Sequence, residues 1–209
     1  MSVSGKEVID FLIQVNNKLI ENKAFLSELD AAIGDGDHGL NMSRGFSAVV
    51  EKIKNDDGKD IGNILKKTGM ALISNVGGAS GPLYGTAFMK AGVAVAGKSE
   101  LTINDFIVIL EEALAGIKMR GKAQLGDKTM IDAIEPALEA LKSAVDNNLS
   151  STESLKLTKE AAYKGVQHTK EIIAKKGRAS YLGERSIGHQ DPGATSSYII
   201  FETVYESLK

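Results

Sequence analysis

The chain has no cysteine among its 209 residues, which excludes disulfides, thiol catalysis and cysteine-ligated zinc. It also has no Lys/Arg-rich run, and its formal net charge is −2, so nothing indicates a nucleic-acid-binding surface. An N-terminal signal pattern and an apolar run long enough to cross a bilayer are both missing. We therefore expect a cytoplasmic protein that binds neither nucleic acid nor membrane.

The period-two alternation typical of strands is absent as well, and apolar residues recur instead at helical spacing. Ser4 with Glu7, and Thr102 with Asp105, have the spacing of capping boxes at helix starts. Pro136 either kinks its helix or marks a later start. No linker or repeat is evident, so residues 1–209 are expected to form one all-α domain without a sheet. The predicted helices span about 4–19, 40–53, 61–72, 86–96, 102–117, 130–145, 152–174 and 193–205.

The connections between these helices alternate between two kinds. Three are short and polar, whereas the other four hold most of the 22 glycines and cover residues 30–39, 75–85, 121–129 and 177–193. Consecutive antiparallel helices place alternate connections at the same end of a bundle. We therefore expect the four glycine-rich loops to meet at one rim and to form one composite site.

The first of these loops carries Asp30, Asp35 and Asp37, interleaved with glycines, in a segment that leaves no room for a regular helix. Carboxylates this close repel one another, and a divalent cation removes the repulsion. Mg²⁺ prefers oxygen ligands from carboxylates and from substrate phosphates. The pattern predicts a metal–phosphate loop, and the alternative is an ordinary Asp–Gly turn.

The second loop, residues 77–86, has four glycines that let the backbone approach an anion, a hydroxyl at Ser80 and a following helix N-terminus. We expect it to bind phosphate, the alternative being a flexible turn. In the third loop, Thr129 with Asp132 is expected to cap the next helix. Gly121 and Met130 are placed to flank a flat base.

The fourth loop is too long to be a simple connection. Arg178 is a candidate phosphate clamp, whereas Arg185 is expected to pair with Glu184 or with a site aspartate. The Asp191-Pro192-Gly193 turn starts the last helix.

In the first loop, His38 is expected to contact nucleotide rather than to carry a phosphoryl group.

Two motif matches are rejected. Residues 34–39 fit G-x-G-x-x-G, but no strand precedes them. Residues 92–99 fit the P-loop pattern that ends in Lys98 and Ser99, but its first glycine lies inside a helical pattern. The alternation of the helices also places this second match at the rim away from the aspartates.

Four segments, residues 34–42, 77–85, 126–130 and 177–189, resemble the nucleotide-binding L subunits of bacterial dihydroxyacetone kinases. The resemblance covers essentially the whole chain. It implies an eight-helix antiparallel up-down barrel with ADP (ATP when phosphorylated) and two Mg²⁺ at one rim. It further implies that Asp30, Asp35 and Asp37 hold the metal and act in catalysis with Arg178. The nucleotide site would comprise His38, Gly39, Leu40, Asn41, Ala79, Ser80, Gly121, Met130, Arg178, Asp191, Pro192 and Gly193.

The same resemblance implies a phosphotransferase activity. ATP-dependent relatives fuse this domain to the substrate-binding domain, so a separate chain resembles the type that depends on the sugar phosphotransferase system. There ADP is a resident coenzyme, a phosphohistidine protein phosphorylates it, and the ATP formed donates to dihydroxyacetone held on another subunit. Two alternatives stay open: an ADP-loaded, non-enzymatic co-regulator of a transcription factor, and an ATP-dependent domain of the fatty-acid-kinase type, which typically has Thr in place of His38.

Overall fold

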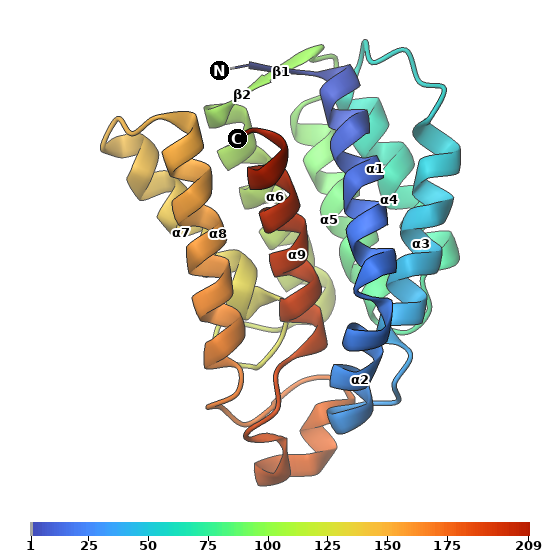
Figure 1. Cartoon of the computed structure of the whole chain (residues 1–209), viewed down its shortest axis with the longest axis vertical. Coiled ribbons are helices and arrows are strands. Elements are labelled where there is room, and N and C mark those ends of the chain that lie inside the picture. Colours follow the sequence, from blue (N-terminus) through green and yellow to red (C-terminus); the bar gives the residue numbers. More distant parts are fainter. Residues whose placement is uncertain (1) are drawn as a thin grey trace.

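The structure, a computed structural model, describes residues 2–209. Eight long helices stand side by side in a ring (Figure 1). Consecutive helices contact each other, and the last returns to contact the first, which closes the barrel. The predicted all-α fold is confirmed. The helices are α1 (Gly5–Glu21), α3 (His38–Ile53), α4 (Ile61–Asn75), α5 (Ser80–Ala94), α6 (Ile103–Gly121), α7 (Ile131–Asp146), α8 (Ser151–His168) and α9 (Pro192–Ser207).

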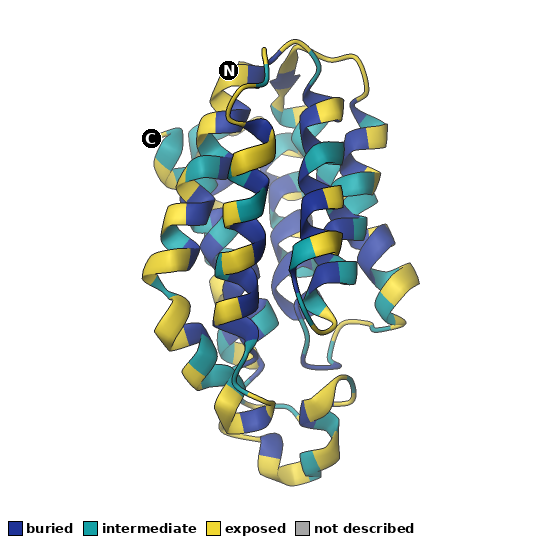
Figure 2. Ribbon diagram, turned by 90° about the vertical axis from the view of Figure 1, so that its right-hand side faces the viewer, coloured by how far each residue is buried: buried dark blue, intermediate teal, exposed yellow. Residues whose placement is uncertain are grey.

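Local sequence signals explain where several of these helices begin. Both predicted capping boxes form, one at Ser4 for α1 and one at Thr102 for α6. Leu12, Val15 and Leu19 then place one face of α1 in the core. Figure 2 shows the same division around the barrel, with buried residues facing inward and exposed residues outward. Burial of a large aliphatic side chain stabilises a fold by about 1.5–3 kcal/mol, so this inward stripe holds the ring together.

The prediction that residues 30–39 form a loop without a helix is wrong in its first part. A short helix, α2 (Lys23–Ile33), precedes α3 and carries Asp30 in its last turn. Its buried residues are Leu26 and Ile33, which lie on one face seven residues apart. Two buried positions give too weak a periodicity to identify a helix from sequence.

The expectation of no sheet is also wrong, although the strands are only three residues long. β1 (Ser2–Ser4) pairs antiparallel with β2 (Glu100–Thr102) at the rim opposite α2 (Figure 1). Two further boundaries differ from prediction, because α5 begins at Ser80 and α8 ends at His168. α7 runs unbroken through Pro136.

The expected long fourth loop contains a 3₁₀ helix, η1 (Arg178–Ser186). η1 contacts α2, and together they form the end of the molecule away from the two strands (Figure 1). Within residues 2–209, no helix is both long and apolar enough to span a bilayer.

Candidate functional site

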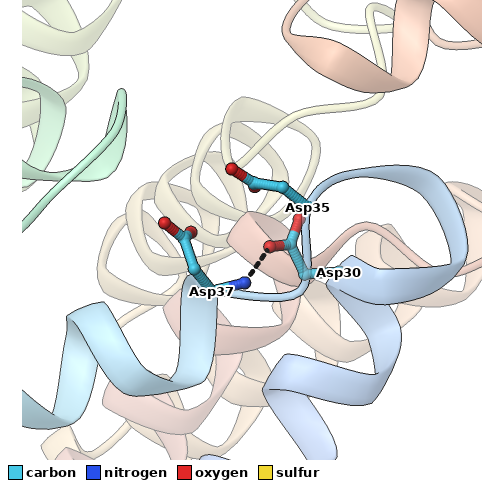
Figure 3. A group of neighbouring side chains, drawn as sticks. All are labelled: Asp30, Asp35 and Asp37. Carbon is cyan, nitrogen blue, oxygen red and sulfur yellow. Dashed lines mark hydrogen bonds between the residues drawn. The ribbon is translucent and has the colours of Figure 1, made fainter.

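The site rim is centred on a cluster of three carboxylates between α2 and α3. One carboxylate oxygen from each of Asp30, Asp35 and Asp37 can be chosen such that all three lie within 4.8 Å of one another. Figure 3 shows the three side chains grouped around the turn that joins the two helices. Three oxygen donors at this spacing are the ligand chemistry that Mg²⁺ uses in phosphate sites. The donor set therefore fits the predicted metal.

Asp30 is the fixed member of the cluster. One of its oxygens, Oδ2, accepts the backbone N–H groups of Asp37 at 2.9 Å and His38 at 3.1 Å, so the turn is shaped around this side chain. Burial raises the pKa of Asp30 above its ordinary value, the two backbone N–H bonds oppose this, and the charges of Asp35 and Asp37 raise it further. A bound cation would remove that electrostatic cost.

Arg178 reaches this cluster from η1. Its guanidinium lies 2.9 Å from Oδ2 of Asp35, and both side chains are exposed. An ion pair with that exposure contributes little to stability. Arg178 thus lies beside the carboxylates in a weak ion pair that costs little to break, as expected of an arginine that binds an anion.

His38 connects two other loops to this one. It is buried, with Nδ1 at 3.2 Å from Oγ of Ser80 and Nε2 at 2.9 Å from Oγ of Ser196. Burial lowers the pKa of His38 to about 4, so the ring is neutral at physiological pH. A neutral imidazole carries one donor and one acceptor, and both ring nitrogens already have protein partners. This geometry disfavours a phosphohistidine role.

Helix N-termini differ between the two rims. All four helices that begin at the rim away from the carboxylates have a side-chain cap, from Ser4, Asp60, Thr102 and Ser150. At the site rim, the N-cap residues Asp37 of α3, Ala79 of α5 and Met130 of α7 make no capping hydrogen bond.

In α7, Thr129 partly fulfils its expected role by accepting the Ile131 N–H. Asp132 accepts the Thr129 N–H at 2.7 Å. The first N–H group of α3, that of His38, donates to Oδ2 of Asp30, whereas α5 has no side-chain cap, and uncapped helix N-termini bind anions.

Other predicted residues lie at the same rim. Gly39 sits where a Cβ would fall 2.0 Å from the Lys23 carbonyl oxygen, so only glycine allows α2 and α3 to approach this closely. Gly193 neighbours Met130, which is buried. Gly121 lies at the end of α6, where an added Cβ would fall 3.0 Å from the Leu83 side chain.

Three further predicted residues have protein partners here. Asn41 accepts from Arg44 at 2.9 Å, next to the glycine loop. Asp191 and Pro192 are buried, and Asp191 caps α9 by accepting the Ala194 N–H at 2.7 Å. Arg185 forms no ion pair within residues 2–209, so its expected pairing is wrong. Leu40 and Ala79 are exposed on the rim.

Lys128 lies in the third loop, and the structure gives this lysine a role that the sequence did not indicate. Its side chain is only 1% exposed, and Nζ donates to the carbonyl oxygens of Thr169, Ser186 and His189 at 2.6, 2.6 and 2.7 Å. Those carbonyls flank the segment that carries Arg178. A lysine between Asp and Thr in a polar loop has no sequence signal for burial, because only the folded fourth loop covers it.

The P-loop look-alike lies at the opposite rim, as expected. Gly97 takes a left-handed φ of +78° after α5, and the Lys98 ammonium pairs with Asp105 at 2.5 Å beside β2. This lysine is therefore committed to a structural ion pair.

Comparison with known proteins shows the family of the chain. The DAK2 domain model matches residues 32–206. The chain is 48% identical, over 209 residues and 100% of both chains, to the ADP-binding subunit DhaL of the PEP-dependent dihydroxyacetone kinase of Escherichia coli K12. It is 44% identical, over 95% of each chain, to the ADP-binding subunit DhaL of the PTS-dependent enzyme of Lactococcus lactis.

Its fold is similar to that in the crystal structure of the dihydroxyacetone kinase of C. freundii in complex with AMP-PNP and Mg²⁺. The TM-score is 0.74 with 25% identity, and the match covers 99% of this chain but 35% of that one. This chain thus spans about a third of that enzyme. The resemblance inferred from the four loops is confirmed, and the chain belongs to the DAK2 domain family.

Proposed function

We propose that this chain is the ADP-binding subunit of a dihydroxyacetone kinase and that Asp30, Asp35 and Asp37 hold two Mg²⁺ against the nucleotide phosphates. The observation that carries the proposal is the convergence of three carboxylates and Arg178 on one rim, next to the N-terminus of α5, which has no side-chain cap. Relatives with this fold are named for ADP binding, and a related structure contains AMP-PNP and Mg²⁺.

The residues fit phosphoryl transfer, which depends on positioning and charge neutralisation more than on covalent chemistry by the protein. Mg²⁺, when bound, neutralises phosphate charge. Arg178 supplies a mobile positive charge, because its present partner Asp35 is exposed and weakly held. Ser80 and the N–H groups at the start of α5 offer donors to a phosphate. Met130, buried beside Gly193, offers an apolar contact for the base.

Within this proposal, ADP is a resident coenzyme. A phosphohistidine protein of the sugar phosphotransferase system phosphorylates it, and the ATP formed donates to dihydroxyacetone on a separate subunit. His38 does not have the features of a phosphoryl carrier, because it is buried with both ring nitrogens occupied. In this proposal the phosphoryl group passes between the partners through the nucleotide.

The test begins with mass spectrometry of the purified chain for bound ADP. Turnover is then measured with dihydroxyacetone and its binding subunit, using either a phosphohistidine donor or free ATP. We expect ADP to copurify, turnover to require the phosphohistidine donor, and Mg²⁺ chelation to release ADP and lower the melting temperature, because a ligand that binds only the folded rim stabilises it. Sustained turnover with free ATP at the rate of the complete system would refute the coenzyme model.

A matched pair of variants distinguishes the loss of a metal ligand from the loss of any negative surface charge. Asp35→Asn removes a cluster charge from an exposed side chain, whereas Asp57→Asn removes one from an exposed aspartate that pairs with Lys59 outside the site. The first variant should lose Mg²⁺-dependent ADP retention and the second should keep it. Equal retention in both would contradict the metal assignment.

A further inference from the structure

A continuous chain of hydrogen bonds runs beneath Ser80 and joins three helices. The Tyr84 hydroxyl on α5 lies 2.7 Å from Oγ of Ser196 on α9, and that Oγ lies 2.9 Å from Nε2 of His38 on α3. Nδ1 of His38 lies 3.2 Å from Oγ of Ser80. Tyr84, Ser196 and His38 are all buried, so water does not compete for these partners.

The far end of this chain meets an apolar wall. The Tyr84 ring and Ser197 border a cavity of about 210 Å³ inside the barrel, lined mostly by aliphatic and phenylalanine side chains. Buried polar groups next to such a surface find their partners within the protein, here each other, Ser197 and the Gly193 carbonyl oxygen, and chains of hydrogen bonds in a low dielectric reinforce one another. The direction of every bond in the chain is therefore coupled to the others.

The chain can run in two directions. In the first, Tyr84 donates to Ser196, Ser196 donates to Nε2 of His38, and the Nδ1–H group donates to Ser80. The Ser80 proton is then free to point into the site. In the second, every bond is reversed, so Ser80 gives its proton to Nδ1 and presents only lone pairs. Both tautomers of His38 are neutral, so no proton enters or leaves when one replaces the other.

The two directions differ in what they allow at the site. A phosphate oxygen is an acceptor, so Ser80 can bond to it only in the first direction. The Tyr84 hydroxyl lies 2.7 Å from Ser196 Oγ, 2.8 Å from Ser197 Oγ and 3.3 Å from the Gly193 carbonyl oxygen. The phenol favours the first direction when it gives its proton to Ser196, because the Ser196 proton is then left for His38. Without the phenol, Ser196 can donate to the Gly193 carbonyl oxygen at 3.1 Å and accept from Nε2–H instead.

We propose that Tyr84 and Ser196 are positioning residues that hold His38 as the Nδ1–H tautomer and thereby keep the Ser80 hydroxyl proton available to a nucleotide phosphate. They act through His38 and Ser80, since Tyr84 and Ser196 lie beneath the rim. The proposal rests on the nucleotide-binding function proposed above.

The experiment uses the full chain with ¹⁵N-labelled histidine, ADP and Mg²⁺. The ¹⁵N shifts of the ring distinguish the two tautomers of His38. Wild type should show Nδ1–H. Tyr84→Phe keeps the ring against the cavity and removes only the hydroxyl; it should shift His38 toward Nε2–H and raise the Kd for ADP about tenfold, the loss of one hydrogen bond to a charged group. The matched control Tyr198→Phe removes a hydroxyl that donates to Glu202 and should change neither measurement.

A double-mutant cycle separates positioning from a general structural effect. If Tyr84 acts through the Ser80 proton, Tyr84→Phe should cause no further loss of ADP affinity in a Ser80→Ala background. If Tyr84→Phe acted by loosening the barrel in general, it would lower the ADP affinity by the same factor with or without the Ser80 hydroxyl. Additive losses, or an Nε2–H tautomer in the wild-type ADP complex, would overturn the proposal. Wild-type protein that binds no ADP would refute the proposed function instead.

Discussion

Replacement of Lys128 by Met tests how the site rim is held together. The Lys128 ammonium is buried and donates to the carbonyl oxygens of Thr169, Ser186 and His189, with a longer contact of 3.3 Å to that of Ile172. Methionine has a similar length and no donor, so the variant leaves these acceptors without their partner. The segment between them, which includes η1, would lose its main polar tie to the barrel.

The expected magnitude follows from these bonds. A buried acceptor left without a donor costs roughly 1–3 kcal/mol, so three short bonds amount to about 3–9 kcal/mol. Part of this is recovered, because the burial of an ammonium is itself unfavourable and a loosened segment lets water reach the carbonyls. We expect the free energy of unfolding to fall by about 3 kcal/mol. ADP affinity should fall as well, since Arg178 lies within that segment.

Urea denaturation followed by circular dichroism measures the loss, and amide hydrogen exchange over residues 169–191 shows where it occurs. The matched control is Lys122→Met, an exposed lysine of the same loop that should change stability by less than about 0.5 kcal/mol. A loss under about 1 kcal/mol for Lys128→Met, with unchanged hydrogen exchange over residues 169–191, would refute the role of Lys128 in holding that segment to the barrel.

Three other predictions follow from the site and its surroundings. Changing any one cluster aspartate to asparagine should weaken Mg²⁺-dependent ADP binding, measured by calorimetry; unchanged binding in all three variants, at Asp30, Asp35 and Asp37, would contradict the cluster. Lys98→Ala should leave ADP binding within about twofold of wild type, because Lys98 lies at the opposite rim; a hundredfold loss, about 2.7 kcal/mol, would revive the P-loop interpretation. Burial raises the pKa of Asp191 to about 7, so the folded chain keeps a proton that the unfolded chain releases near pH 4. The retained proton stabilises the fold below pH 4, and this stabilisation is lost as the pH rises through 7. The free energy of unfolding of Asp191→Asn, measured in urea without ADP and Mg²⁺, should therefore increase relative to that of the wild type between pH 4 and pH 7. A difference that stays constant over this range would contradict the shift.

Local patterns in the sequence predict most of the architecture. The capping boxes at Ser4 and Thr102 and the apolar faces of the long helices depend on residues three or four positions apart, so they are visible without a fold. The alternation of plain and glycine-rich connections then predicts one functional rim. The three aspartates could be recognised as one cluster because their mutual repulsion is a property of the segment itself.

Prediction failed where the local signal was short or the partner distant. α2 has only two buried residues, Leu26 and Ile33, and each paired strand has three residues, so neither shows a period. Arg185 has several carboxylates nearby in sequence, yet forms no ion pair within the part of the chain that the structure describes.

The sequence by itself determined the helical class, the single site rim and the carboxylates that gather there, because these follow from periodicity, chain order and local charge. Only the tertiary structure decided what Lys128, Tyr84 and Ser196 do. Their partners lie 41 or more residues away for Lys128 and 112 residues away for the tyrosine–serine contact. A buried polar group must find its partners within the protein. Burial therefore makes Lys128 donate to the carbonyl oxygens of the fourth loop, and it makes the Tyr84 and Ser196 hydroxyl groups part of one chain of hydrogen bonds.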